Sequence, residues 1–237
     1  WDRPVTASLT TSFYVEKDLM KLKYAVLPIE ATAADEAKIR EYAMTLYFQL
    51  TDSTSTTNFE ELARITSEDP ASAEQGGLLG DYTARGAWVK EFEDVAFALD
   101  SGAISEPVRT KYGFHIIQSH GKKVDSTGVE LVKVSHILLA VTASSETVDS
   151  LERIMEDVKV AFESSENFDA AAKTKNLPVH TSEWLSKGDQ IPSLGYVPGL
   201  TAYSFANKER PDVSSGPISS VLKNKNFVVI ASKIDSL

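Results

Sequence analysis

The sequence predicts an α+β fold in which one structural plan is used twice. The chain has 237 residues, which is long enough for two domains of about 100 to 150 residues each. Its two halves repeat the same order of elements: a strand, a long helix, two short helices and a closing strand pair. This order predicts, in each half, a small antiparallel sheet flanked by one long and two or three short helices.

The first half opens with an apolar strand pattern at Lys21 to Ile29. A long helix follows, predicted by apolar residues three and four positions apart: Ile39, Tyr42, Ala43, Leu46 and Tyr47. Short helices are predicted at Phe59 to Ile65 and Lys90 to Leu99. The hairpin from Ser101 to Val108 and the strand Phe114 to Ile117 close the unit.

The second half repeats this order from the strand Val132 to Val141, where Lys133 to Leu139 aligns with Lys21 to Leu27. The remaining predicted elements are a long helix carrying Val148, Leu151, Ile154, Met155, Val158 and Phe162, short helices at 168–173 and about 200–206, and a hairpin at 212–218 with the strand 227–230. Because Asp125 to Gly128 is polar and ends in glycine, we interpret it as a linker. The predicted domains are therefore residues 21–124 and 132–237, joined by 125–131.

The amino-terminal segment, residues 1–20, is predicted to be an extended arm, rich in Thr and Ser. Two interpretations stay open: a return segment from a missing amino-terminal domain, or a boundary tail. The chain starts at Trp1 without a methionine or a signal-peptide pattern, so we interpret it as an excised piece.

Composition excludes several functions. A net charge of −10 and a pI near 4.9 repel phosphate backbones, so nucleic acid is not expected as a partner. No run approaches the roughly 18 apolar residues of a membrane span, so no membrane contact is expected in this fragment. There is no cysteine, and the four histidines lack metal-ligand spacing, so neither a metal nor a cofactor is expected.

Three blocks between Phe59 and Gln118 point to a function. The first contains Ser67-Glu68-Asp69-Pro70 and Gly76-Gly77-Leu78-Leu79-Gly80, the second is Phe92 to Leu99, and the third reads Tyr112-Gly113-Phe114-His115-Ile116-Ile117. In this order and at this spacing they resemble the parvulin-type peptidyl-prolyl isomerase domain. With the internal repeat, the chain resembles tandem-domain periplasmic folding factors of the SurA and PpiD kind.

The resemblance implies a proline pocket. Leu79, Trp88 and Phe92 fall on positions where parvulins usually carry leucine, methionine and phenylalanine, and Tyr112 falls on the pocket rim. Trp88 departs from the family and offers a larger, flatter wall. The alternative interpretation is that these side chains belong to an ordinary core. The glycines of the first block permit a tight loop with close backbone approach.

Asp69 falls where parvulins place a cysteine or aspartate beside the isomerising bond. A carboxylate there sets the local field, and partial burial is expected to raise its pKa. The alternative is an exposed Asp-Pro turn.

His115 matches a core histidine of the family, whose partner is a histidine on the first strand. Tyr24 occupies that first-strand position, where a Tyr24–His115 hydrogen bond can substitute for the pair. We predict a supporting role for His115, not that of a general base. In the second half His136 is present but faces Val228, so each unit carries half a pair. Nothing in the sequence brings His115 and His136 together.

By resemblance, two functions are open. One is an X-Pro isomerase, of ordinary or weak activity, that acts on unfolded exported proteins in the bacterial periplasm or cell envelope, with residues 21–124 as the nominal catalytic domain. The other is a non-catalytic chaperone or scaffold that binds proline-containing clients through parvulin-like grooves. The acidic residues Asp35 and Glu36, where phospho-specific members carry basic ones, argue against phosphate recognition. In the family the parent protein is sometimes membrane-anchored.

Overall fold

The structure is a computed structural model that describes residues 19–200 and 221–236. The chain divides into two compact units. The inner unit is contiguous, from Glu30 to Thr147, and the outer unit combines the residues up to Ile29 with those from Val148 onward. The predicted α+β class with antiparallel sheets is confirmed.

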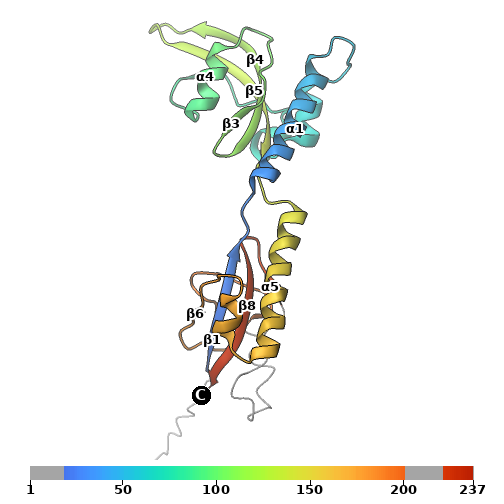
Figure 1. Cartoon of the computed structure of the whole chain (residues 1–237). Coiled ribbons are helices and arrows are strands. Elements are labelled where there is room, and N and C mark those ends of the chain that lie inside the picture. Colours follow the sequence, from blue (N-terminus) through green and yellow to red (C-terminus); the bar gives the residue numbers. More distant parts are fainter. Residues whose placement is uncertain (1–18, 201–220, 237) are drawn as a thin grey trace, which may run out of the picture. The chain divides into compact units, whose positions relative to one another are not determined.

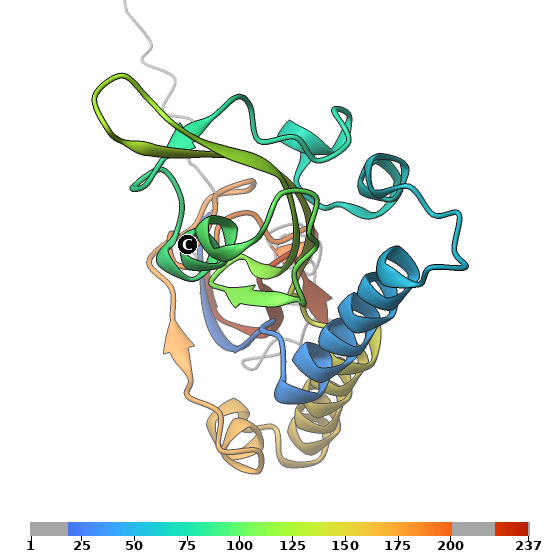
Figure 2. The same ribbon diagram turned by 90° about the horizontal axis from the view of Figure 1, so that it is seen from above.

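The sheet of the inner unit has the order β2-β5-β4-β3, all antiparallel. Its central strands are β4 (Gly113–Val124) and β5 (Glu130–Ala140), and its edges are the short strands β2 (Thr83–Ala84) and β3 (Val108–Thr110). β4 and β5 form a long hairpin whose tip projects from the rest of the unit (Figure 2).

Helices cover both faces of this sheet. α1 (Ala33–Thr51) and α2 (Phe59–Thr66) pack against one face, where Phe114 and Ile116 meet Ala43 and Leu46. α4 (Lys90–Ala98) packs against the other face, which carries Ile117, Val132 and Val134. Figure 1 shows α1 and α4 on opposite sides of β4 and β5. The short helix α3 (Pro70–Ala73) follows α2.

A buried carboxylate fixes the start of α1. Thr32 and Asp35 form a capping box, in which each side chain accepts a hydrogen bond from the other residue's backbone N–H. Asp35 is only 3% exposed. It also accepts hydrogen bonds from the Ser144 N–H and, at 2.7 Å, from the Thr147 hydroxyl. These donors hold the pKa of Asp35 far below its usual value. Asp35 therefore ties the beginning and the end of the inner unit together.

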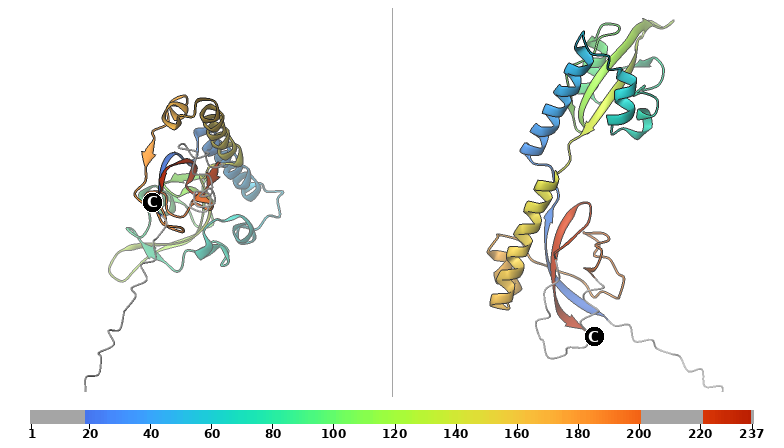
Figure 3. Two further views of the ribbon diagram at one scale, coloured as in Figure 1. Left: turned by 90° about the horizontal axis from the view of Figure 1, so that it is seen from below. Right: turned by 90° about the vertical axis from the view of Figure 1, so that its right-hand side faces the viewer.

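The outer unit has a sheet of order β6-β1-β8-β7. Its strands are β1 (Met20–Pro28), β6 (His180–Thr181), β7 (Leu222–Lys223) and β8 (Phe227–Ser236). Two helices, α5 (Ser145–Ser165) and α6 (Phe168–Lys173), pack on one face of this sheet. Figure 3 shows α5 running along β1 and β8.

The predicted domain boundary is wrong. Residues 125–128 are the turn of the β4–β5 hairpin, in which the Asp125 side chain accepts hydrogen bonds from the N–H groups of Thr127 and Val129. The inner unit therefore keeps the strand that was assigned to the second domain. Conversely, β1 pairs with β8 and belongs to the outer unit. A polar, glycine-ended segment is a signature of tight turns as much as of linkers.

Several predicted elements lie outside the described residues. These are most of the arm 1–20, the helix at about 200–206 and the hairpin at 212–218. The described helices α1, α2, α4, α5 and α6 lie where the periodicity predicted them. Within the described part of the chain, no helix combines the length and apolar character needed to cross a membrane.

Candidate functional site

A pocket of about 430 Å³ opens on the α4 face of the inner sheet. The residues that line it are Asp69, Leu79, Ala87, Trp88, Val89, Phe92, Tyr112, His115, His136 and Leu138. Six of the seven predicted site residues thus meet in one place: Asp69, Leu79, Trp88, Phe92, Tyr112 and His115. The exception is Tyr24.

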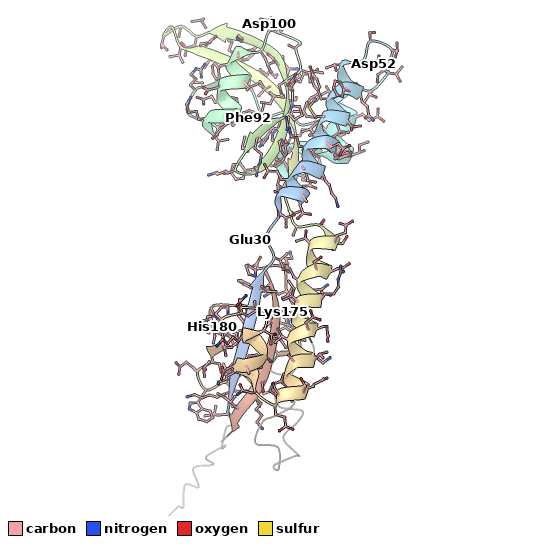
Figure 4. All side chains as sticks on the ribbon, in the orientation of Figure 1. Glu30, Asp52, Phe92, Asp100, Lys175 and His180 are labelled. Carbon is pink, nitrogen blue, oxygen red and sulfur yellow. The ribbon has the colours of Figure 1, made fainter. Side chains whose placement is uncertain are left out.

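Aromatic rings form the floor and one wall of the pocket. Phe92 of α4 is 2% exposed and is labelled in Figure 4. Its ring lies edge-on to Trp88 at 5.5 Å, to His115 at 5.3 Å and to His136 at 5.7 Å between centroids. Edge-to-face packing of this kind is favourable beyond simple burial. Tyr112 is 56% exposed, which places its ring at the pocket rim.

The loop that follows α2 is bonded to β5 along its length. The Glu68 N–H donates to the Leu138 carbonyl at 2.8 Å, and the Leu138 N–H donates to the Ser67 hydroxyl. Further along, the His136 N–H donates to the Gly77 carbonyl at 2.8 Å, and the Leu79 N–H donates to the Val134 carbonyl. These bonds position Asp69 and Leu79 beside β5.

Gly77 makes this close approach feasible. Its φ is +81°, and a Cβ there would lie 2.2 Å from the carbonyl oxygen of His136. The predicted close approach is present at Gly77, where β5 is the neighbouring backbone, whereas nothing lies within 4 Å of a Cβ at Gly80.

Two histidines lie side by side under the pocket. The Nδ1 atoms of His115 and His136 are 3.1 Å apart, and the rings stack with an interplanar angle of 23°. Both residues are buried, at 4% and 5% exposure. The Nε2 atom of His115 lies 2.8 Å from the hydroxyl of Thr110, which accepts the Tyr112 N–H.

Asp69 ends this chain of hydrogen bonds. It is the N-cap of α3, where it accepts the Ala71 N–H. Its Oδ2 atom lies 2.9 Å from the Nε2 atom of His136 and accepts the Ser72 hydroxyl at 2.6 Å. The alternative interpretation of Asp69 as a freely exposed turn is therefore wrong, although the residue does begin a short helical turn.

The protonation states follow from these contacts. Burial acts to raise the pKa of the Asp69 carboxyl, but hydrogen bonds from Ser72, His136 and Ala71 together hold it below its usual value. The expectation of a raised pKa is thus wrong. Burial lowers the pKa of His115 to about 4, helped by repulsion from His136. Burial also lowers the pKa of His136, against the attraction of Asp69. At neutral pH the site therefore holds an ionised Asp69 and two neutral histidines.

One arrangement of protons satisfies every contact. An ionised Asp69 requires that the Nε2–H of His136 donates to it, so the Nδ1 atom of His136 must accept from the Nδ1–H of His115. The Nε2 atom of His115 then accepts from the Thr110 hydroxyl. Every hydrogen bond of the network is thus donated in the same direction, from Thr110 through His115 and His136 to Asp69.

Tyr24 does not take part in this site. It lies on β1 in the outer unit, where its ring packs 5.4 Å from His180 and its hydroxyl lies 3.4 Å from that of Ser193. The predicted Tyr24–His115 hydrogen bond is wrong, because β5 rather than β1 pairs with β4. The prediction that each unit carries half a histidine pair is therefore wrong, because the inner unit contains both histidines of the pair.

Sequence reasoning missed His136 and the apolar lining residues Ala87, Val89 and Leu138. Of these, His136 bears on the chemistry. Its signal was present, because it is the residue that aligns with the family's first-strand histidine. The predicted linker at residues 125–131 separated His136 from the first domain, so the residue was assigned to the second one. Within the described residues, no group of three or more His, Asp or Glu side chains is placed to hold a metal ion.

Part of the chain matches a known family. Residues 19–121 match the family model of the rotamase, or PPIC-type PPIase, domain. The chain carries a parvulin-type peptidyl-prolyl isomerase domain. The rotamase match includes β1 and ends before β5, whereas in the structure the domain's sheet contains β5. His136 thus comes from beyond the matched residues.

The chain is also similar to named foldases. It is 54% identical over 61 residues to foldase protein PrsA 1 of Bacillus cereus, covering 26% of this chain and 21% of that protein. It is 36% identical over 126 residues to foldase protein PrsA of Oceanobacillus iheyensis, covering 50% and 42% respectively. The matches therefore span less than half the length of these relatives. A crystal structure of the PrsA peptidyl-prolyl isomerase from Bacillus anthracis matches at 23% identity over 69% of this chain and 63% of that one. Its TM-score of 0.28 is too low to establish a common arrangement.

Proposed function

We propose that the chain catalyses cis-trans isomerisation of X-Pro bonds in unfolded exported polypeptides, and that the inner unit is the catalytic domain. The observation that carries this proposal is the apolar pocket with the Asp69–His136–His115 network in its wall. The rotamase match and the names of the foldase relatives support the same activity.

The reaction needs little covalent chemistry. Rotation about a prolyl amide crosses a barrier of roughly 18 to 20 kcal/mol, and unaided it takes tens to hundreds of seconds. In the twisted transition state the amide loses its resonance and becomes less polar. A catalyst therefore needs an apolar socket for the ring and a few fixed polar groups nearby.

The pocket residues suit these two tasks. Leu79, Trp88 and Phe92 would hold the proline ring, with Tyr112 at the rim. The carboxylate of Asp69 would set the field beside the rotating bond. His115 and His136, being neutral, would hold that carboxylate in place without adding charge. None of these groups needs to transfer a proton to the substrate.

We propose that the site does not select phosphorylated substrates. Asp69 is the only charged residue among those lining the pocket when both histidines are neutral. Glu36 pairs with Arg109 at 2.6 Å, so that cation is already neutralised. The inner unit also contains nineteen Asp and Glu residues against ten Lys and Arg, a net charge of −9. A phosphate dianion would approach an unfavourable field.

The outer unit is proposed to be a second parvulin-like domain without catalytic activity. Its strand order corresponds to that of the inner sheet, with β1 in the place of β5 and β8 in the place of β4. Tyr24 lies on a sheet face that Leu185, Leu194 and Val197 pack against. In this unit Leu200 is buried in the same core, whereas Tyr196 is 66% exposed. This unit would serve binding or spacing.

Location and clients follow from the relatives. Foldase names imply polypeptide clients, and we propose that these are exported proteins folding in the bacterial cell envelope. The second candidate function, binding without turnover, is favoured in the sequence by Tyr24, by Trp88 and by the second half, which lacks the first motif block. Because His115 and His136 do pair, the structure favours catalysis.

Exchange NMR on short X-Pro peptides would test the proposal. Catalytic amounts of the protein should produce cis-trans exchange cross-peaks, and the Asp69→Ala variant should weaken them. A Glu68→Ala variant is the matched control, because Glu68 is the adjacent carboxylate and does not line the pocket. Peptide shift changes without exchange would instead establish a binding module.

A further inference from the structure

Part of the pocket wall belongs to a short loop, Arg85 to Trp88, which side chains of α4 hold in place. Glu93 of α4 accepts a hydrogen bond from the backbone N–H of Gly86, and its carboxylate lies 3.9 Å from the guanidinium of Arg85. The Glu93 side chain is only 12% exposed, whereas that of Arg85 is 52% exposed. One largely buried carboxylate therefore fixes both the backbone and a side chain of the loop.

The loop has a second attachment to the same helix. The guanidinium of Arg85 lies 4.1 Å above the ring of Phe97 and 3.6 Å from Asp94. Gly86 has a φ of +96°, a conformation that only glycine adopts easily, so the chain turns sharply there. Trp88 follows two residues later, with its ring edge-on to Phe92 at 5.5 Å. The position of the Trp88 ring thus depends on contacts made by its neighbours.

We propose that Trp88, held in place by Glu93, selects the side chain next to the proline in the substrate. It would favour aromatic and large aliphatic side chains over acidic ones. This inference rests on the proposed function. Trp88 would be the specificity-determining residue, and Glu93 a positioning residue that acts through the loop.

The size and lining of the pocket lead to this preference. A volume of about 430 Å³ accommodates more than one five-membered ring. Trp88 is partly exposed, so part of its flat face is available to a neighbouring side chain. An indole face stacks well with aromatic groups and packs well with aliphatic ones. Ionised Asp69 lines the same pocket and would repel a carboxylate.

The test uses the full chain and two peptide series, one varied before the proline and one after it, with Phe, Leu, Ala or Glu at the varied position. The wild-type protein should prefer Phe and Leu over Glu in at least one series. In Trp88→Met, which carries the residue usual in the family, the Phe-to-Ala preference in that series should fall roughly three- to tenfold, the worth of one aromatic contact. The Phe-to-Ala ratio is taken within each variant, so a weaker grip on the proline ring, which lowers activity on all peptides alike, does not change it.

A second set of variants tests the role of Glu93. Glu93→Ala should raise KM for the preferred peptide and leave kcat nearly unchanged. Glu93→Gln keeps an oxygen for the Gly86 N–H and should restore most of the affinity. Glu91→Ala is the matched control, because Glu91 is an exposed acidic residue on the same helix. In a background where Trp1 and Trp184 are replaced by Phe, the fluorescence anisotropy of Trp88 should fall in Glu93→Ala and not in Glu91→Ala.

The outcomes separate this inference from the proposed function. Absence of exchange on every peptide would overturn the proposed function and this inference with it. Exchange with the same preferences in wild type and Trp88→Met would overturn the inference alone. Unchanged Trp88 anisotropy in a folded Glu93→Ala would overturn the positioning role. Circular dichroism spectra matching the wild type establish that a variant is folded.

Discussion

The Nδ1 atoms of His115 and His136 lie 3.1 Å apart, on two adjacent strands joined by a tight turn. At its far nitrogen His115 meets Thr110, and His136 meets Asp69 and Ser72. The pair therefore connects the carboxylate beside the pocket to the edge strand β3. Because β5 supplies His136, the candidate site is complete within residues 30–147.

His136→Asn is expected to lower kcat/KM on X-Pro peptides about tenfold or more. The substitution removes the donor that holds the Asp69 carboxylate, and a hydrogen bond to a charged group contributes about 1.5 to 3 kcal/mol. Peptide exchange NMR measures the effect. Tyr24→Phe is the control, since Tyr24 lies in the outer unit, and its activity should match the wild type. A loss of activity in Tyr24→Phe with none in His136→Asn would mean that β1, and not β5, supplies the site residue beside His115.

Gly77→Ala is expected to destabilise the inner unit more than Gly80→Ala does. Both glycines have positive φ, +81° and +89°, so each alanine suffers a backbone strain of about 1 to 2 kcal/mol. Only at Gly77 would the new Cβ meet the His136 carbonyl, at 2.2 Å, whereas nothing lies within 4 Å at Gly80. Displacing β5 should cost about 1 to 3 kcal/mol more. Urea unfolding measures the difference, and equal losses would contradict the contact.

Stability is expected to fall as the pH drops from about 6.5 towards 4. Burial lowers the pKa of His115 to about 4, whereas an unfolded histidine titrates near 6.5. Between these two values the unfolded chain binds a proton at His115 and the folded chain does not. The contribution of His115 to the free energy of unfolding is therefore complete above about pH 6.5 and is lost as the pH falls towards 4. The shift corresponds to about 3 kcal/mol. The pKa of His136 is lowered in the same direction.

Urea unfolding at pH 7 and pH 4.5 measures this loss. The pH dependence should be weaker in His115→Asn than in the wild type. A wild-type protein that is equally stable at both values would show that the histidine pair accepts protons in the folded state.

Local patterns in the sequence were enough to predict most of the elements and the pocket. The apolar spacing of the helices reflects burial of one face, and that rule depends on neighbouring residues only. The three motif blocks likewise brought Asp69, Leu79 and Phe92 together correctly, because all of them belong to one contiguous segment.

Strand pairing was not predictable in the same way. β1 and β5 carry similar apolar patterns, so either could satisfy the central position of the inner sheet by periodicity alone. The choice depends on tertiary contacts, such as the Gly77 carbonyl that receives the His136 N–H. The prediction that the pKa of Asp69 is raised was wrong for a related reason. The hydroxyl of Ser72 and the imidazole of His136 donate to this carboxylate only once the chain has folded.

Residues 30–147 are expected to fold as an isolated fragment, and residues 19–124 are not. The first fragment keeps the β4–β5 hairpin and the contacts of Asp35 with Ser144 and Thr147. The second follows the rotamase match but lacks β5, which would leave the long edge of β4 unpaired and the core side chains Val132, Val134 and Ile137 missing. Circular dichroism, a cooperative urea transition and dispersed amide NMR signals measure folding. Cooperative folding of 19–124 with X-Pro exchange activity would mean that β1 can replace β5 beside β4, and that Tyr24 can stand in for His136.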